Sequence, residues 1–276
     1  MKYFLILLAG ILVINTVNAQ QQINTTSPYK TEFWTDAGII TGTVGLNVLG
    51  FYFIQNKDGK SLEEVNMLSE DDVWAVDRWV AGNYSEEADR ISYIPFYSSF
   101  ALPLTFLAGD ETRENMGQIS VLYVESMATA GALYTLSAGL IDRDRPLVYN
   151  RNVTNEERME SSAQRSFFAG HGAATAAATF FTAKVFHDYY PDSPLRPYVW
   201  GVAFAIPAYV GYLRIEAGKH FLTDTVLGLG VGAAAGILIP ELHKKENTNL
   251  SFYPTYQQNL NGSGFDAKGV ALSYRF

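Results

Sequence analysis

An arginine, a histidine and an aspartate follow one another closely at Arg214, His220 and Asp224, within the stretch RIEAGKHFLTD. If His220 opens a helix, Asp224 lies one turn later on the same face, because residues four apart are neighbours on a helix. The carboxylate can then accept a hydrogen bond from one ring nitrogen of His220 and aim the other nitrogen outward. Such a histidine can act as a nucleophile or a base, and the Arg214 guanidinium suits phosphate oxygens. We expect an anion site here; a chance surface cluster is the alternative.

Two other segments carry groups of the same kind. Arg145-Pro146 follows an apolar run, and the proline ends the helix so that the guanidinium lies just outside it. Gly170-His171 opens another apolar run, where a helix N-terminus offers free N–H groups to an anion and glycine allows close approach. In an up-and-down bundle these segments and the Arg214 stretch lie at one end. The sequence therefore predicts one shared pocket, although His171 alone would more often be a packing residue.

Six apolar stretches are long enough to form the helices that position these segments. Small residues from Gly228 to Gly236 in the last stretch would allow close helix approach. Another segment, from Glu70 to Asn83, has valines and tryptophans at helical spacing and is expected to be an amphipathic helix. We predict an all-α, six-helix bundle whose apolar stretches are 33–54, 91–108, 116–141, 167–186, 198–212 and 221–240.

The composition limits the possible functions. Hydrophobic residues make up 48% of the 276 residues and charged residues 17%, with a mean hydropathy of +0.01. The net charge of -8 argues against a nucleic-acid partner. The absence of cysteine excludes disulfides, thiol catalysis and cysteine-ligated zinc. The loop 142–165 holds five arginines and is a candidate cover for a ligand or an ordinary solvated loop.

The two ends of the chain differ from its middle. Residues 1–19 have the charged start, apolar run and small-residue end of a signal peptide, with an uncleaved anchor as the alternative. Residues 20–32 are a polar segment expected to be loosely attached. Residues 33–245 are the predicted helical domain. Residues 246–276 predict a β-hairpin packed on that domain, because two strand-like runs flank a glycine-rich turn; an outer-membrane assembly signal is the alternative.

The three motifs together resemble those of the type 2 phosphatidic acid phosphatases (PAP2), which share a core with class A acid phosphatases and vanadium haloperoxidases. Arg145-Pro146 matches the end of the first family motif, and Gly170-His171 matches the end of the second. Arg214, His220 and Asp224 match the third with its spacing intact. The resemblance covers roughly residues 70–240.

The resemblance also has gaps. Ala138 stands at the lysine position of the first motif, Ala169 and Phe168 replace the serine and proline of the second, and Leu213 replaces the serine before Arg214. The missing lysine and serine would both donate to phosphate, and each loss could weaken binding by about 1.5–3 kcal/mol. Arg143 or Lys219 are candidates to supply the missing charge.

The resemblance implies a phosphatase that works through a phosphohistidine. His220 would attack phosphorus with Asp224 orienting it, and His171 would protonate the leaving oxygen and then activate water. Arg145, Arg214 and the Gly170 amide would hold the phosphate oxygens, with no metal or other cofactor. The expected substrate is a lipid phosphate or lipid pyrophosphate.

Two other functions stay open, a soluble-substrate periplasmic acid phosphatase and a weakened phosphate-binding or membrane-structural protein. We expect an exported, membrane-associated protein whose site faces the periplasm, although a cleaved signal followed by six crossings would place the site in the cytoplasm.

Overall fold

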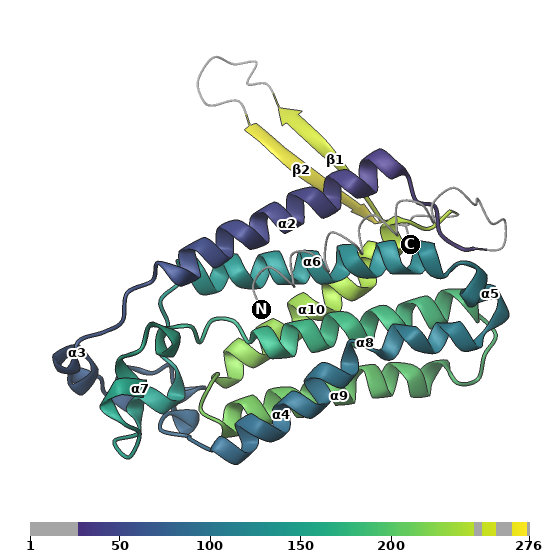
Figure 1. The fold of residues 1–276 in the computed structure, drawn as a ribbon. Helices are drawn as coiled ribbons and strands as arrows, with labels where there is room; N and C mark the ends of the chain where they lie inside the picture. The colour runs from purple at the N-terminus through teal and green to yellow at the C-terminus, as the bar shows by residue number, and fades with distance from the viewer. Residues whose placement is uncertain (1–26, 246–249, 258–266, 275–276) are drawn as a thin grey trace.

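The computed structural model describes residues 27–245, 250–257 and 267–274 (Figure 1). The predicted signal peptide lies outside the described residues. Within the described residues, six long helices form a bundle, as the apolar stretches predicted. They are α2 (Phe33–Gln55), α4 (Glu86–Ser99), α6 (Met116–Leu140), α8 (Gly170–Tyr189), α9 (Arg196–Glu216) and α10 (Leu222–Leu242).

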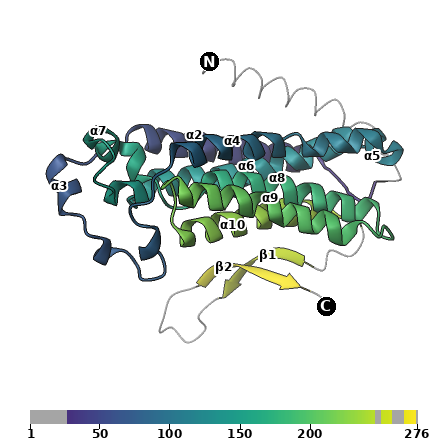
Figure 2. The same ribbon diagram turned by 90° about the horizontal axis from the view of Figure 1, so that it is seen from below.

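Short helical elements connect the long ones. Figure 2 shows α3 and α7 at one end of the elongated bundle and α5 at the other. The connecting elements are α3 (Leu62–Met67), the 3-10 turns η1 (Glu70–Asp72), η2 (Arg78–Val80) and η3 (Leu102–Ala108), α5 (Asp110–Glu114), η4 (Pro146–Tyr149), α7 (Asn155–Met159) and η5 (Ser161–Gln164).

The prediction of an amphipathic helix between Glu70 and Asn83 is wrong. This segment contains only the turns η1 and η2, and Trp74 and Trp79 are exposed. Asp77, between the two turns, is fully buried and accepts a 3.0 Å hydrogen bond from the Thr223 backbone N–H. This tertiary contact draws the middle of the segment into the bundle, and a continuous helix is not formed.

Helices α8 and α10 pack through small residues. A Cβ added to Gly228 would lie 2.5 Å from the Ala169 carbonyl oxygen, and one on Gly236 would lie 2.6 Å from that of Ala177. Gly232, midway between them, faces the Ala173 backbone in the same way. The close approach predicted from the glycine run is therefore confirmed, and it brings the N-terminal turns of both helices together.

Residues 27–32, the described part of the polar N-terminal segment, are firmly attached to the bundle. The Tyr29 side chain is fully buried in a core cluster with Phe106 and Phe181. Its hydroxyl donates a 2.8 Å hydrogen bond to Asp188, and the Lys30 N–H donates to the His243 carbonyl at 2.7 Å. The expectation of a loosely attached segment is wrong here, because a single aromatic anchor and backbone pairing fix it.

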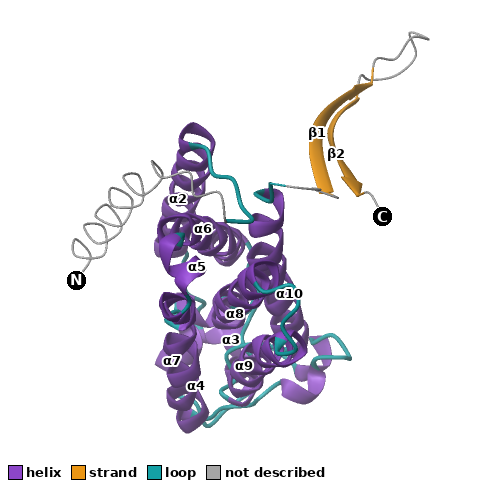
Figure 3. Cartoon of the chain, turned by 90° about the vertical axis from the view of Figure 1, so that its right-hand side faces the viewer, coloured by secondary structure: helices purple, strands orange, loops and turns teal. Residues whose placement is uncertain are grey.

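The C-terminal residues contain β1 (Leu250–Gln257) and β2 (Ala267–Tyr274), which pair antiparallel with Leu250 opposite Tyr274. Among the described elements, β1 contacts α10. Figure 3 shows the hairpin extending away from the helices, whereas the sequence suggested that it packs on them.

In the part of the chain that the structure describes, five helical segments are long and apolar enough to cross a membrane, judged by length and composition. Most of α8 is buried among the other helices, while α2 exposes apolar side chains such as Trp34 and Val48. These features support a membrane-associated protein. The candidate spans are Phe33–Gln55, Glu86–Ala108, Met116–Leu140, Arg196–Glu216 and Leu222–Leu242.

Candidate active site

Backbone hydrogen bonds join the three predicted motif segments at the end of the bundle that carries α3 and α7. The Leu147 N–H, next to Arg145-Pro146, donates to the Gly218 carbonyl at 3.0 Å. The Ala169 N–H, at the start of α8, donates to the Asp224 carbonyl at 3.1 Å. Gly218 has φ +67°, a left-handed conformation that glycine adopts at little cost. The turn between α9 and α10 is thereby fixed to both other segments.

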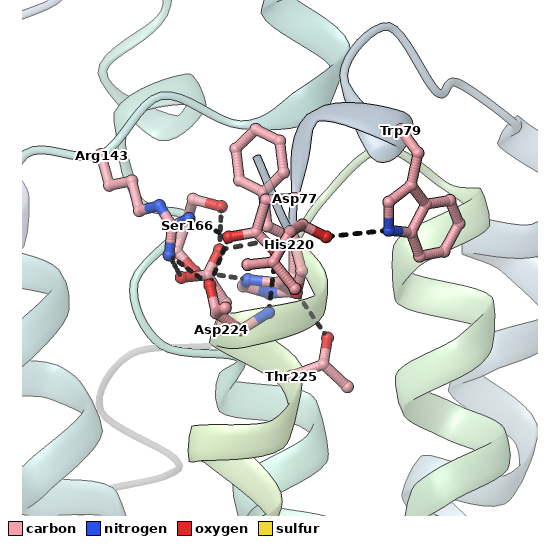
Figure 4. Close-up of polar contacts among 10 residues, drawn as sticks. Asp77, Trp79, Arg143, Ser166, His220, Asp224 and Thr225 are labelled. Atoms are coloured by element: carbon pink, nitrogen blue, oxygen red, sulfur yellow. Dashed lines mark hydrogen bonds and ion pairs between the residues drawn. The ribbon is translucent and has the colours of Figure 1, made fainter. Parts of the chain in front are cut away.

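His220 is buried, with 2% of its surface exposed. Its Nδ1 lies 2.6 Å from the Ser166 main-chain carbonyl, as Figure 4 shows. A carbonyl only accepts, so Nδ1 carries the proton and Nε2 has the free lone pair. Burial, then the charges of Arg145 and Arg214, hold the pKa of His220 well below its usual 6.5. The ring is therefore neutral and nucleophilic at Nε2.

The carboxylate of Asp224 does not accept the hydrogen bond from His220 that the sequence predicted. It instead accepts from the Ser166 hydroxyl at 2.6 Å and from the Phe221 backbone N–H at 3.0 Å, and it pairs with Arg143. Asp224 thus fixes Ser166, whose carbonyl accepts the hydrogen bond from His220, and the Phe221 backbone next to His220. It orients the ring indirectly, through Ser166, because its carboxylate is held by the first turn of its own helix.

Arg143 and Asp77 extend this network. Arg143 bridges Asp224 and Asp77, with a 2.7 Å contact to the latter. Asp77 also accepts from the Thr223 N–H at 3.0 Å, and Figure 4 shows these groups gathered beside His220. Neither Ser166 nor Asp77 was singled out from the sequence. Both lie far from His220 along the chain, and only packing brings them there.

His171 lies in the first turn of α8, and its ring packs 4.3 Å from Phe96 and 5.2 Å from Tyr93, centroid to centroid. Burial, then the charge of Arg214, lowers the pKa of His171 to about 3. The neighbouring Gly170 lies against the Tyr134 ring, which a Cβ would approach to 2.5 Å. A side chain at 170 would therefore have to displace the Tyr134 ring, so Gly170 serves packing besides any role toward an anion.

Three arginines near these histidines have buried donors with nothing to bond. The Nε–H groups of Arg145, Arg165 and Arg214 have no hydrogen-bond partner among the described residues. Burial is the main cause that lowers the pKa of Arg145 to about 10, and the charges of Arg214 and Arg165 add to it. An unsatisfied buried donor costs about 1–3 kcal/mol. This part of the structure therefore concentrates unpaired positive donors, an arrangement suited to a multiply charged oxyanion.

The family comparison agrees with this arrangement. The model of the PAP2 superfamily matches residues 120–248, which include all three motif segments. This region is similar to the PAP2 superfamily. The resemblance inferred from the motifs is thus confirmed.

Two individual proteins are also similar to the chain. A lipid A 4'-phosphatase of Porphyromonas gingivalis is 29% identical over 77 residues, which are 28% of this chain and 29% of that protein. The chain therefore matches less than a third of the curated relative's length. The crystal structure of a transmembrane PAP2-type phosphatidylglycerolphosphate phosphatase from Bacillus subtilis has a TM-score of 0.47 and 19% identity, covering 74% of this chain and 98% of that one.

The PAP2 motif lysine is absent, and neither candidate substitute from the sequence is well placed. Ala138, at the lysine position, is fully buried. Arg143 is already paired with two carboxylates, and Lys219 faces Asp89 at 3.7 Å and Glu157 at 3.6 Å. Arg165 instead has the unpaired donor beside Arg145. The sequence analysis named Arg165 only as a member of the arginine-rich loop. Its position directly before the segment Ser166-to-Gly170 could have identified it as a candidate site residue.

Arg214 has a carboxylate partner on one side. One terminal nitrogen pairs with Asp89, and the same nitrogen lies 3.3 Å from the Ser92 hydroxyl. Both partners come from α4, which carries Phe96 and Tyr93 as well. Helix α4 therefore packs against Arg214 and His171 and orients Arg214, whose Nε–H has no partner among the described residues.

Proposed function

We propose that this chain is a metal-independent phosphatase of lipid phosphate or lipid pyrophosphate monoesters that acts through a phosphohistidine. The three unpaired Nε–H donors of Arg145, Arg165 and Arg214, beside two imidazoles, are the observation that carries the proposal. A bound phosphate would satisfy these donors, and bonds between ionised partners are the stronger ones. Three guanidinium groups supply the charge neutralisation that a metal provides elsewhere.

The proposed reaction has two steps. His220 Nε2 attacks phosphorus, a P–N bond forms, and the bond from phosphorus to the leaving oxygen breaks while His171 donates a proton to that oxygen. His171 then takes a proton from water, the water oxygen attacks phosphorus, and the P–N bond breaks to release phosphate. The Ser166 carbonyl stabilises the positive charge that develops on His220, because it accepts from Nδ1 throughout.

His171 must gain a proton before the first step. In the empty pocket its ring is neutral, because burial and Arg214 disfavour the imidazolium. A bound phosphate dianion offsets the arginine charges and favours the charged ring. The substrate therefore brings about the protonation that its own leaving group requires.

A lipid substrate fits the surroundings of the pocket. Candidate membrane spans α4, α9 and α10 carry or flank the site, and the His171 ring is flanked by aromatic side chains of α4. The name of the Porphyromonas relative also denotes a lipid phosphatase. A weakened, phosphate-binding protein is the second candidate, favoured by Ala138 and Ala169 at two donor positions.

Phosphate release by the purified full chain from phosphatidic acid in detergent micelles tests the function. We expect His220→Ala to lower turnover by roughly 10³-fold or more, since it removes the nucleophile. His187→Ala is the matched control, because His187 lies near the other end of α8 against Arg196 and Trp200. Equal phosphate release by wild type and His220→Ala would contradict the proposed phosphatase activity. Phosphate binding without release would favour the second candidate.

We also propose that the site faces the periplasm. Asn150 lies at the site end, where its side chain donates to the Gly82 carbonyl at 2.8 Å, and Lys245 lies at the other end beside Pro28. Reporter fusions after these two positions should therefore report opposite sides of the membrane, with Asn150 outside. A cytoplasmic reporter signal at Asn150 would reverse the proposed orientation.

A further inference from the structure

A second group of buried polar side chains lies at the end of the bundle opposite the candidate active site. Asp36 comes from the first turn of α2, Glu125 from α6, and His243 from the residue that follows α10. Asp36 and Glu125 are 2% and 0% exposed. In the described part of the chain, these three form the group of histidine and carboxylate side chains whose ligand atoms come within 4.8 Å of one another.

The two distances from His243 to the carboxylates suit a shared cation. His243 Nε2 lies 3.3 Å from Asp36 Oδ1 and 3.5 Å from Glu125 Oε2. Zinc bonds of roughly 2.0–2.2 Å in a tetrahedron separate neighbouring ligand atoms by about 3.3–3.6 Å. The other ring nitrogen, Nδ1, lies 2.8 Å from the Ile239 carbonyl and so carries a proton. In the neutral ring this bond leaves the Nε2 lone pair directed at the two carboxylates, the usual arrangement for a ligating histidine.

Glu125 supplies an independent sign of a missing ligand. Both of its carboxylate oxygens are buried and have no hydrogen-bond donor in the described parts of the chain. A buried carboxylate without hydrogen bonds or compensating charge is costly, and buried charges in proteins are normally paired or bind metals. The group that faces its Oε2 is His243, at 3.5 Å, too long for a hydrogen bond.

The site is open to a hydrated cation from one side. A cavity of 320 Å³ is lined by Asp36 and His243 together with residues of the N-terminal segment and the end of α10. Two lysines also line it, but each is paired, Lys30 with Glu32 at 2.6 Å and Lys244 with Asp188 at 2.9 Å. Three protein ligands and a fourth position facing this cavity match an open tetrahedral site.

We propose that Asp36, Glu125 and His243 bind one divalent cation of the zinc class. One imidazole and two carboxylates neutralise such an ion in charge and match its preference for nitrogen and oxygen ligands. Because the ligands come from α2, α6 and the end of α10, the ion ties together three segments that lie far apart in the sequence. The site is structural, and it is independent of the proposed phosphatase function.

Zinc content of the purified full chain in detergent tests this site. The protein is stripped with a chelator, equilibrated with Zn²⁺ alone, desalted and analysed by elemental mass spectrometry. We expect about one zinc ion per wild-type chain and a higher melting temperature with zinc than without, because a ligand that binds only the folded state stabilises it. X-ray absorption should show one imidazole and oxygen ligands at about 2.0–2.2 Å.

Variants assign the ligands. Glu125→Gln and His243→Gln should each lose the bound zinc and the zinc-dependent rise in melting temperature, whereas His187→Ala should keep both. Wild-type protein that retains no zinc would overturn the proposal and leave a protonated His243 paired with the carboxylates. A full equivalent of zinc in Glu125→Gln would overturn it as well. The wild-type measurement decides the question even if a variant fails to fold, and none of these results depends on phosphatase activity.

Discussion

Arg165 offers the sharpest test of the proposed phosphate site. Its Nε–H is buried without a partner, and its charge acts on Arg145, a residue of the matched motif. The lysine expected by the family pattern is replaced by Ala138, which is fully buried. We infer that Arg165 contributes the positive charge that this lysine would otherwise bring to the phosphate.

The size of the effect follows from the bond that is lost. A hydrogen bond between a charged donor and phosphate contributes about 1.5–3 kcal/mol. Arg165→Ala should therefore lower kcat/KM by roughly 10- to 150-fold, since about 1.4 kcal/mol corresponds to a factor of ten. Arg165→Lys should recover part of the loss, because it restores the charge but not the planar fork of donors. The melting temperature without phosphate should not fall, since the wild-type Nε–H has no partner to lose.

Initial rates of phosphate release across a range of phosphatidic acid concentrations in micelles provide the measurement. Arg151→Ala is the matched control, because Arg151 belongs to the same arginine-rich loop but is exposed. A kcat/KM for Arg165→Ala within about twofold of the wild type would refute the reasoning, because a group that contacts the phosphate cannot be removed at so small a cost. A similar loss in Arg151→Ala would refute it too, since that result would reflect the loop's general charge.

Three further measurements test other parts of the structure. Ala169→Ser restores a family hydroxyl at the start of α8 and should raise turnover; an unchanged rate would show that another donor already serves the phosphate. Burial and nearby arginine charges hold the pKa of His220 below 6.5, so the unfolded chain binds a proton there first as the pH falls. Its contribution to stability is thus present above pH 6.5 and lost below it, and thermal scans from about pH 8 to about pH 5 should show a smaller loss for His220→Gln than for wild type. Gly232→Val places a side chain against the Ala173 backbone and should destabilise the bundle by about 1–3 kcal/mol in denaturant unfolding. Gly230→Val should lower the free energy of unfolding less, because nothing lies within 4 Å of the added Cβ. Equal losses in the two variants would contradict the close α8–α10 packing.

The sequence by itself determined the residue types at the site and the helices that carry them. Long apolar stretches predict helices because their side chains must be buried or placed in lipid, and the boundaries observed for α6 and α10 lie within a few residues of those predicted. The run from Gly228 to Gly236 predicted close approach because small side chains permit it. The spacing of Arg214, His220 and Asp224 could be recognised because the three residues lie close together along the chain.

The hydrogen-bond partners of the site residues were decided by the tertiary structure alone. Local spacing suggested that Asp224 bonds His220, but packing brings the Ser166 carbonyl to that ring instead. The role of Asp77 could not be predicted from the sequence, because its contact with Thr223 joins residues far apart in the chain.

The group of Asp36, Glu125 and His243 shows the same limit most clearly. Each residue appears in the sequence as an isolated polar side chain in or beside an apolar stretch, with no motif around it. Their meeting depends on the relative register of α2, α6 and α10. That register is set by the packing of many side chains over the whole length of the helices, which no local pattern encodes.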